Sequence, residues 1–140
     1  MLLLDEAATR AAGAQLAAVL HGGEAIALVG DLGAGKTTFV AGLVEALGGG
    51  AAASPTFSLI NEYPGGRLVV WHADLYRIER EAELAELGLD DVIGDPRGVV
   101  LVEGADRVSV LPAGHTRIEL RHVPAGRELV ATGPLSATFP

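Results

Sequence analysis

Hydrophobic positions follow a helical spacing in two parts of the first third of the 140-residue chain. The first covers residues 6–20, begins after Asp5, which can cap a helix, and ends at the glycines 22–23. The second covers residues 39–47 and stops at three glycines, 48–50. Between them, residues 25–29 form an unbroken apolar run, as expected of a buried parallel strand. This region therefore predicts a helix, a strand and a second helix.

The rest of the chain alternates between strand patterns and one helical pattern. Short strands are predicted at residues 57–63 and 68–73, and the four-residue turn between them makes the pair antiparallel. Residues 75–92 have helical spacing with a break near Gly88. A second unbroken apolar run, residues 99–102, predicts another buried strand. Strict alternation over residues 117–122 and 128–132 predicts a half-exposed hairpin that covers one sheet edge.

The link between the strand at residues 25–29 and the helix after it reads Gly-Asp-Leu-Gly-Ala-Gly-Lys-Thr-Thr, residues 30–38. This is the phosphate-loop pattern of a glycine, four residues and Gly-Lys-Thr, in the strand–loop–helix context that the motif requires. Glycines let backbone N–H groups approach an anion. Lys36 supplies a charge for the terminal phosphates and Thr37 a hydroxyl for Mg²⁺. The predicted nucleotide-binding residues are Asp31, Leu32, Gly33, Ala34, Gly35, Lys36, Thr37 and Thr38.

Together these patterns predict an α/β fold of the P-loop NTPase type. We expect a three-layer sandwich whose mixed sheet has a parallel core and antiparallel edge strands. Residues 1–133 should form a single domain, and residues 134–140 should be a frayed C-terminal tail.

Two acidic residues close apolar strands and are candidates for the chemistry of a phosphate-loop protein. Asp74 would be the second magnesium anchor, acting through a bound water, although capping the following helix also explains it. Glu103 would orient or polarise the attacking water, and a purely structural carboxylate that hydrogen-bonds the loops is the alternative. His72 shares a strand face with Asp74 and is expected in a supporting role rather than as a metal ligand. Thr56, with Ser54, is a candidate for a catalytic loop hydroxyl, and an ordinary surface linker is an equal alternative.

Charge and composition narrow the function classes. Eighteen acidic and ten basic residues give a formal net charge of −8, which makes direct, unaided binding to nucleic acid a poor expectation. The absence of cysteine excludes a disulfide framework and suits the cytoplasm. No basic segment precedes the first apolar residues and no run is long enough for a membrane span, so neither a signal peptide nor a membrane partner is expected.

Four motifs in this order and spacing resemble the TsaE (YjeE) family of small bacterial ATPases. They are the phosphate loop at 30–38, Ser-Pro-Thr-Phe at 54–57, Asp-Leu-Tyr-Arg at 74–77 and Val102-Glu103. The resemblance implies ATP and Mg²⁺ as cofactors and a role with TsaD and TsaB in making N6-threonylcarbamoyladenosine at position 37 of tRNA, with tRNA met only through the complex. It also implies catalytic roles for Lys36, Thr56 and Glu103, and metal binding by Thr37, Asp74 and Glu103. Gly104 departs from the tryptophan that the family usually has.

Two other functions are compatible with a phosphate loop. A small-molecule kinase would need an acceptor pocket and usually an arginine-bearing lid, and residues 48–57 contain no basic residue. A GTP-driven binding switch would usually carry an Asn-Lys-x-Asp segment, which is missing here because Asn61 is the only asparagine.

Overall fold

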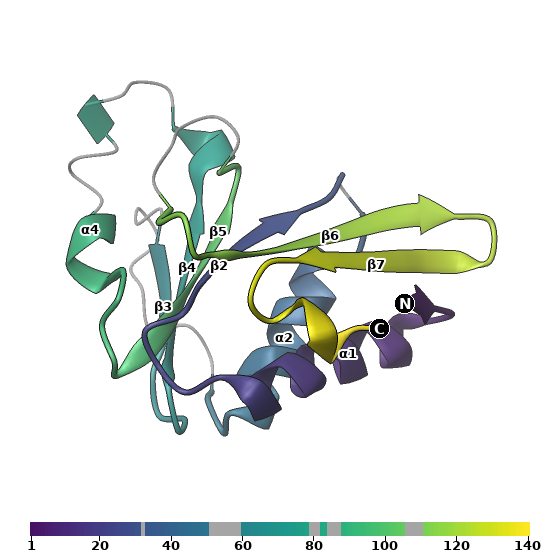
Figure 1. Cartoon of the computed structure of the whole chain (residues 1–140), viewed down its shortest axis with the longest axis horizontal. Helices are drawn as coiled ribbons and strands as arrows, with labels where there is room; N and C mark the ends of the chain where they lie inside the picture. The colour runs from purple at the N-terminus through teal and green to yellow at the C-terminus, as the bar shows by residue number, and fades with distance from the viewer. Residues whose placement is uncertain (32, 51–59, 79–81, 84–87, 106–110) are drawn as a thin grey trace.

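The computed structural model describes residues 1–31, 33–50, 60–78, 82–83, 88–105 and 111–140 (Figure 1). A seven-stranded sheet with the order β1-β7-β6-β2-β5-β4-β3 runs through the molecule. Its strands are β1 (Leu2–Leu3), β2 (Ala25–Val29), β3 (Ile60–Tyr63), β4 (Val69–Asp74), β5 (Gly98–Glu103), β6 (Thr116–Val123) and β7 (Gly126–Thr132). The described helices are α1 (Glu6–Val19), α2 (Lys36–Ala46) and α4 (Leu89–Val92), with 3-10 turns η1 (Leu75–Arg77) and η2 (Ser136–Thr138).

The centre of the sheet is parallel and its two sides are antiparallel. Strands β6, β2, β5 and β4 pair in parallel, whereas β3 pairs antiparallel with β4, and β7 pairs antiparallel with β6 and β1. The predicted mixed sheet with a parallel core is therefore confirmed. The parallel order also brings the carboxyl ends of β2, β5 and β4 to one edge, where ligands of such sheets bind.

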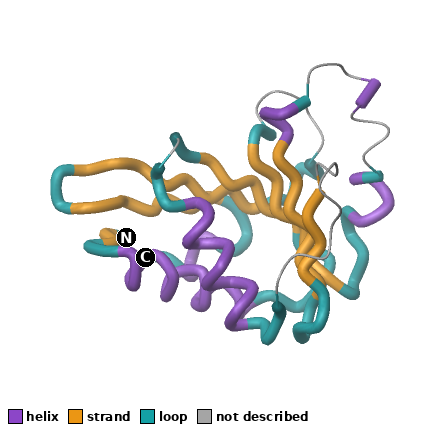
Figure 2. Tube along the Cα trace, turned by 180° about the vertical axis from the view of Figure 1, so that it is seen from behind, coloured by secondary structure: helices purple, strands orange, loops and turns teal. Residues whose placement is uncertain are grey.

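Helices α1 and α2 lie side by side on one face of the sheet (Figures 1 and 2). The backbones approach so closely that a Cβ added to Gly13 would lie 2.2 Å from the Phe39 carbonyl oxygen, and one added to Gly42 would lie 2.1 Å from that of Arg10. Asp5 caps α1 as predicted, because its side chain accepts a hydrogen bond from the Ala8 amide at 2.8 Å. Phe39 and Leu43 of α2 are fully buried against this face, which holds the larger apolar core.

A second apolar cluster covers the other face of the β5–β4 side. Trp71 and Val100 from the strands meet Leu75 and Ile78 after β4, and Leu89 at the start of α4. The short elements η1 and α4 therefore stand where a third layer is expected. No helix in the described ranges is both long and apolar enough to span a bilayer.

The predicted helix over residues 75–92 is wrong at its start. Residues 75–77 form a 3-10 turn, capped by the Asp74 side chain, and Ile78 returns to extended backbone with φ −77° and ψ 127°. The predicted break is confirmed, because Gly88 has a left-handed φ of +73° and precedes α4. In the predicted strand at residues 57–63, the described part begins at Ile60.

The expectation of a frayed C-terminus is also wrong. Phe139 is only 6% exposed and packs its ring on Phe39, with centroids 6.4 Å apart and planes tilted by 52°. The Leu135 amide donates a hydrogen bond to the Thr116 hydroxyl at 3.2 Å, which holds the start of the turn on β6. The chain end is ordered because the aromatic side chain of the penultimate residue, Phe139, is buried.

The C-terminal hairpin belongs to the sheet itself. Strand β6 pairs with β2, so the hairpin extends the sheet instead of only covering its edge. The outer strand β7 is in turn paired with β1, and the Met1 ammonium donates a hydrogen bond to the Leu129 carbonyl oxygen at 3.0 Å. The pairing of β1 places the start of the chain beside the Gly126 turn of the hairpin.

Candidate active site

A cavity of about 850 Å³ opens at the carboxyl ends of the parallel strands. It joins segments that are far apart in the sequence: the start of α1, the loop after β2, the ends of β4 and β5, and the start of β7. Its polar or charged lining side chains are Asp5, Glu6, Thr9, Asp31, Lys36, Thr37, Thr38, Asp74, Tyr76, Glu103 and Arg127.

The loop at residues 30–38 has the backbone that a phosphate cradle needs. Gly33 and Gly35 have φ values of +80° and +101°, a region that side-chain-bearing residues rarely adopt. Gly30 packs so closely on β6 that a Cβ would lie 2.8 Å from the Leu120 carbonyl oxygen. Ala34 is buried and fixes the loop to the core. Gly35 precedes the first residue of α2, so the helix directs its amide groups at the cavity.

Lys36, which is the chain's only lysine, holds the loop closed by a hydrogen bond to the Gly30 carbonyl oxygen. Its ammonium nitrogen also lies 3.7 Å from Glu103 Oε1. The other carboxylate oxygen, Oε2, lies 3.0 Å from His72 Nε2. The three side chains are mostly buried and form a chain of polar contacts from β4 through β5 to the loop.

This arrangement keeps Glu103 ionised. Burial alone would raise the pKa of its carboxyl, but the hydrogen bond and charge of His72, followed by the charge of Lys36, outweigh burial and hold the pKa below its ordinary value. At neutral pH the carboxylate is therefore able to accept a proton or a hydrogen bond. The contact of His72 with Glu103 is the supporting position expected of this histidine.

Asp74 and Glu103 are register partners on the neighbouring parallel strands β4 and β5. The parallel pairing of β4 with β5 therefore places these two acidic residues side by side at the strand ends. One oxygen of Asp74, Oδ1, accepts a hydrogen bond from the Tyr76 amide at 3.1 Å, which is the capping alternative for this residue. Because both carboxylates and Thr37 line the same cavity, they fit Mg²⁺, which typically takes one or two carboxylates together with phosphates and waters.

The structure brings together most of the site residues predicted from the sequence. Asp31, Gly33, Gly35, Lys36, Thr37, Thr38, Asp74 and Glu103 all line the cavity, whereas Ala34 lies in the core beneath the loop. Leu32, Ser54 and Thr56 lie outside the described residues.

Sequence reasoning missed one end of the cavity. Leu4, Glu6 and Thr9 line it from the start of the chain, and Arg127 lines it from the hairpin. Arg127 Nη2 donates a hydrogen bond to the Gly33 carbonyl oxygen at 3.1 Å. No local pattern signals these residues, since their positions depend on the pairing of β1 with β7.

A phosphate loop between a buried parallel strand and a helix, with carboxylates at the ends of the two neighbouring strands, defines a protein of the P-loop NTPase fold. A family model described as Threonylcarbamoyl adenosine biosynthesis protein TsaE matches residues 3–129. The chain belongs to the TsaE family.

Individual relatives agree with this assignment. The chain is 37% identical over 143 residues to the tRNA threonylcarbamoyladenosine biosynthesis protein TsaE of a Nostoc species, an alignment that covers 99% of this chain and 88% of the relative. It is 47% identical over 98 residues to the protein of that name from Bacillus subtilis, covering 69% and 60% of the two chains. The crystal structure of Bacillus subtilis YdiB is similar with a TM-score of 0.72 and 35% identity, covering 89% of this chain and 78% of that one.

Proposed function

We propose that this protein hydrolyses ATP to ADP and phosphate and thereby supports N6-threonylcarbamoyladenosine formation on tRNA. The observation that carries the proposal is the single cavity that unites the phosphate loop with Asp74 and Glu103. The names of the relatives supply the pathway. TsaD and TsaB are the proposed protein partners, and the cytoplasm is the proposed location.

We assign phosphate binding, metal binding and orientation of the attacking water to different residues of the cavity. The loop amides and Lys36 would hold the phosphates, and Lys36 would turn from the Gly30 carbonyl toward the terminal phosphate. Thr37 and, through a water, Asp74 would hold Mg²⁺, with Glu103 close enough to take part. When bound, the ion would offset the charge that develops on the phosphate oxygens. The ionised Glu103 would accept a hydrogen bond from the attacking water and orient it toward the terminal phosphorus.

The charge of the protein supports an indirect route to tRNA. A formal net charge of −8 opposes binding to a polyanion, so partner proteins would hold the RNA. We expect slow hydrolysis by the isolated protein, because the sequence contains no unambiguous arginine finger. Phosphate release measured with and without TsaB and TsaD tests this dependence, and full activity of the isolated protein would contradict it.

Replacing Lys36 tests the phosphate-loop assignment directly. Lys36→Ala removes the cation that we assign to the terminal phosphate, and we expect ATP affinity in calorimetry to fall by about 100-fold or more. Arg10→Ala is a control, because Arg10 forms an exposed ion pair with Glu45 and does not line the cavity that contains the loop. Because Lys36 is the only lysine, acetylation mapped by mass spectrometry gives a second measurement, in which ATP should protect it. Unchanged ATP affinity in Lys36→Ala would refute the assignment.

A further inference from the structure

The cavity extends to both sides of the phosphate loop. In the strand order, β5 and β4 lie on one side of β2 and carry Glu103 and Asp74. Strands β6, β7 and β1 lie on the other side, and the cavity lining there includes Leu4, Gly126 and Arg127. If the terminal phosphate faces the two carboxylates, the nucleoside at the other end of the ligand must lie toward β7 and β1.

Arg127 presents a planar cation at this second side. Its Nη1 donates to the Gly126 carbonyl oxygen at 3.0 Å and its Nη2 to the Gly33 carbonyl oxygen at 3.1 Å. Within the described part of the chain it forms no ion pair with a carboxylate, unlike Arg117 and Arg121 on the same hairpin, which both contact Glu119. Two carbonyls thus fix the guanidinium beside the loop while its charge stays available to a π-system.

Leu4 provides an apolar surface at the same side of the cavity. Leu4 directly follows β1, lines the cavity and is 66% exposed. The pairing of Leu3 with Arg127 in the sheet brings the two segments together. Gly126 permits this close approach, since a Cβ there would lie 2.4 Å from the Leu3 carbonyl oxygen. An exposed leucine beside a fixed guanidinium matches the faces of a flat heterocycle.

We propose that Leu4 and Arg127 clamp the base of the bound nucleoside triphosphate, the guanidinium by stacking and Leu4 by apolar contact. The inference rests on the proposed function, because it takes the phosphates to lie on the loop. The base is held by its faces and not read at its edge, so ATP and GTP gain similarly from the clamp. This chain has Gly104 where the family usually has tryptophan, and an aromatic ring at that position is then not required for base binding in this protein.

Competition between ATP and inorganic tripolyphosphate separates the base from the phosphates. We expect Arg127→Ala to weaken ATP and GTP binding by about five- to twentyfold. The same variant should change tripolyphosphate binding less than twofold. Arg127→Lys keeps the charge without the planar face and should be nearly as weak toward ATP as Arg127→Ala. Leu4→Ser should lower ATP affinity about threefold, again without an effect on tripolyphosphate.

Matched controls exist for both residues. Leu2→Ser changes a leucine that is 54% exposed on β1 and does not line the cavity. Arg121→Ala changes an arginine of the same hairpin that is paired with Glu119. Both controls should bind ATP like the unmodified protein.

The outcomes distinguish this inference from the proposed function. Equal weakening of ATP and tripolyphosphate by Arg127→Ala, recovery of ATP affinity in Arg127→Lys, or unchanged ATP affinity in both Arg127→Ala and Leu4→Ser would overturn the clamp. Failure of the unmodified protein to bind ATP or tripolyphosphate, or a Lys36→Ala variant that binds both normally, would instead overturn the phosphate-loop site.

Discussion

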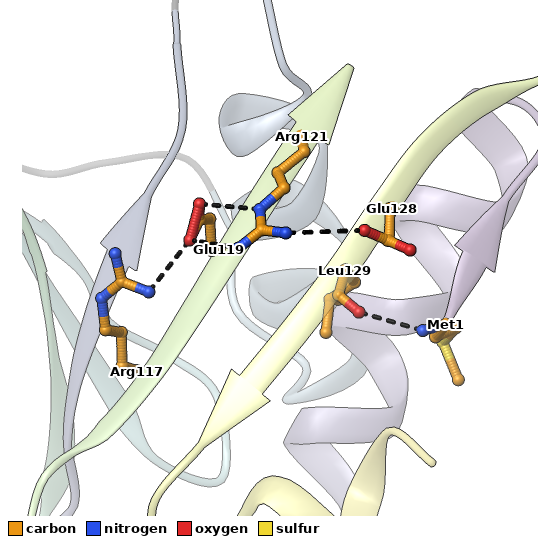
Figure 3. A network of polar contacts seen from close by, with 6 residues as sticks. All are labelled: Met1, Arg117, Glu119, Arg121, Glu128 and Leu129. Carbon is orange, nitrogen blue, oxygen red and sulfur yellow. Dashed lines mark hydrogen bonds and ion pairs between the residues drawn. The ribbon is translucent and has the colours of Figure 1, made fainter. Parts of the chain in front are cut away.

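The sheet has two halves, one formed by β2, β5 and β4 and the other by the β6–β7 hairpin, and they differ in the burial and polarity of their residues. Strand β2 and the part of β5 that precedes Glu103 are apolar without interruption and buried on both faces, whereas β6 alternates between buried and exposed positions. The outer face of the β6–β7 hairpin carries a charge network in which Glu119 joins Arg117 and Arg121, and Arg121 reaches Glu128 (Figure 3).

The difference explains how each half contributes to the site. In the β2–β5–β4 half, a charged residue is rare, so Asp74 and Glu103 stand out at the strand ends and mark the chemistry. In the hairpin half, charged side chains are frequent on β6 and at the start of β7, so Arg127 does not stand out although it lines the same cavity. In this chain, a charged site residue could be recognised from the sequence where its neighbours along the strand are apolar, and not where they are also charged.

The largest expected effect concerns what holds the inner face of the hairpin half. Phe139→Ala removes a buried ring that packs on Phe39, and we expect the free energy of unfolding to fall by about 3 kcal/mol. Urea unfolding measures the change. Deletion of the exposed Pro140 is the control and should have almost no effect. A loss below about 0.5 kcal/mol for Phe139→Ala would mean that the hairpin half does not depend on the chain end.

The same residue shows where sequence reasoning ends. The buried run of β2, the capping of α1 by Asp5 and the loop at 30–38 were predictable because each depends on neighbours in sequence. The order of Phe139 and the place of Arg127 depend on contacts more than 90 residues away, with Phe39 and Gly33.

The strand-end carboxylates lie between these cases. The apolar runs made Asp74 and Glu103 recognisable as acidic residues at strand ends. Their adjacency, however, requires β4 and β5 to be neighbouring strands, and only the sheet topology determines this. The two-residue β1 is too short for any periodicity, so the segment that brings Leu4 to the cavity could not be predicted from its pattern.

A matched pair of valines tests the comparison within one face of the sheet. Val100 on β5 is fully buried in the cluster with Trp71, while Val130 on β7 is half-buried next to Glu119. We expect Val100→Ala to lower the free energy of unfolding by about 2 kcal/mol and Val130→Ala by less than about 1 kcal/mol. Equal losses in urea unfolding would show that the two halves are covered alike on this face.

The smallest expected effect is electrostatic and belongs to the outer face of the hairpin. Hydrogen bonds from Arg121 and then Arg117 lower the pKa of Glu119 to about 2, against an ordinary value of 4.5. Because the pKa is lower in the folded state, the charged Glu119 stabilises the fold above about pH 4.5, and this contribution disappears as the pH falls toward 2. The side chains of Arg117 and Arg121 are 44% and 51% exposed, so solvent screens the network and its contribution is at most about 1 kcal/mol.

Glu119→Gln tests this contribution because it removes the charge and keeps the shape. The unmodified protein should be more stable than the variant at pH 6, and the difference should vanish near pH 2 and shrink in 1 M salt (roughly a 3 Å screening length). Glu45→Gln, which breaks the single exposed ion pair with Arg10, is the control and should have a smaller effect at pH 6. A difference between Glu119→Gln and the unmodified protein that stays constant from pH 6 to pH 2 would show that Glu119 acts through packing. Such a result would contradict the view that ion pairs stabilise the outer face of the hairpin half, in contrast to the apolar β2–β5–β4 half.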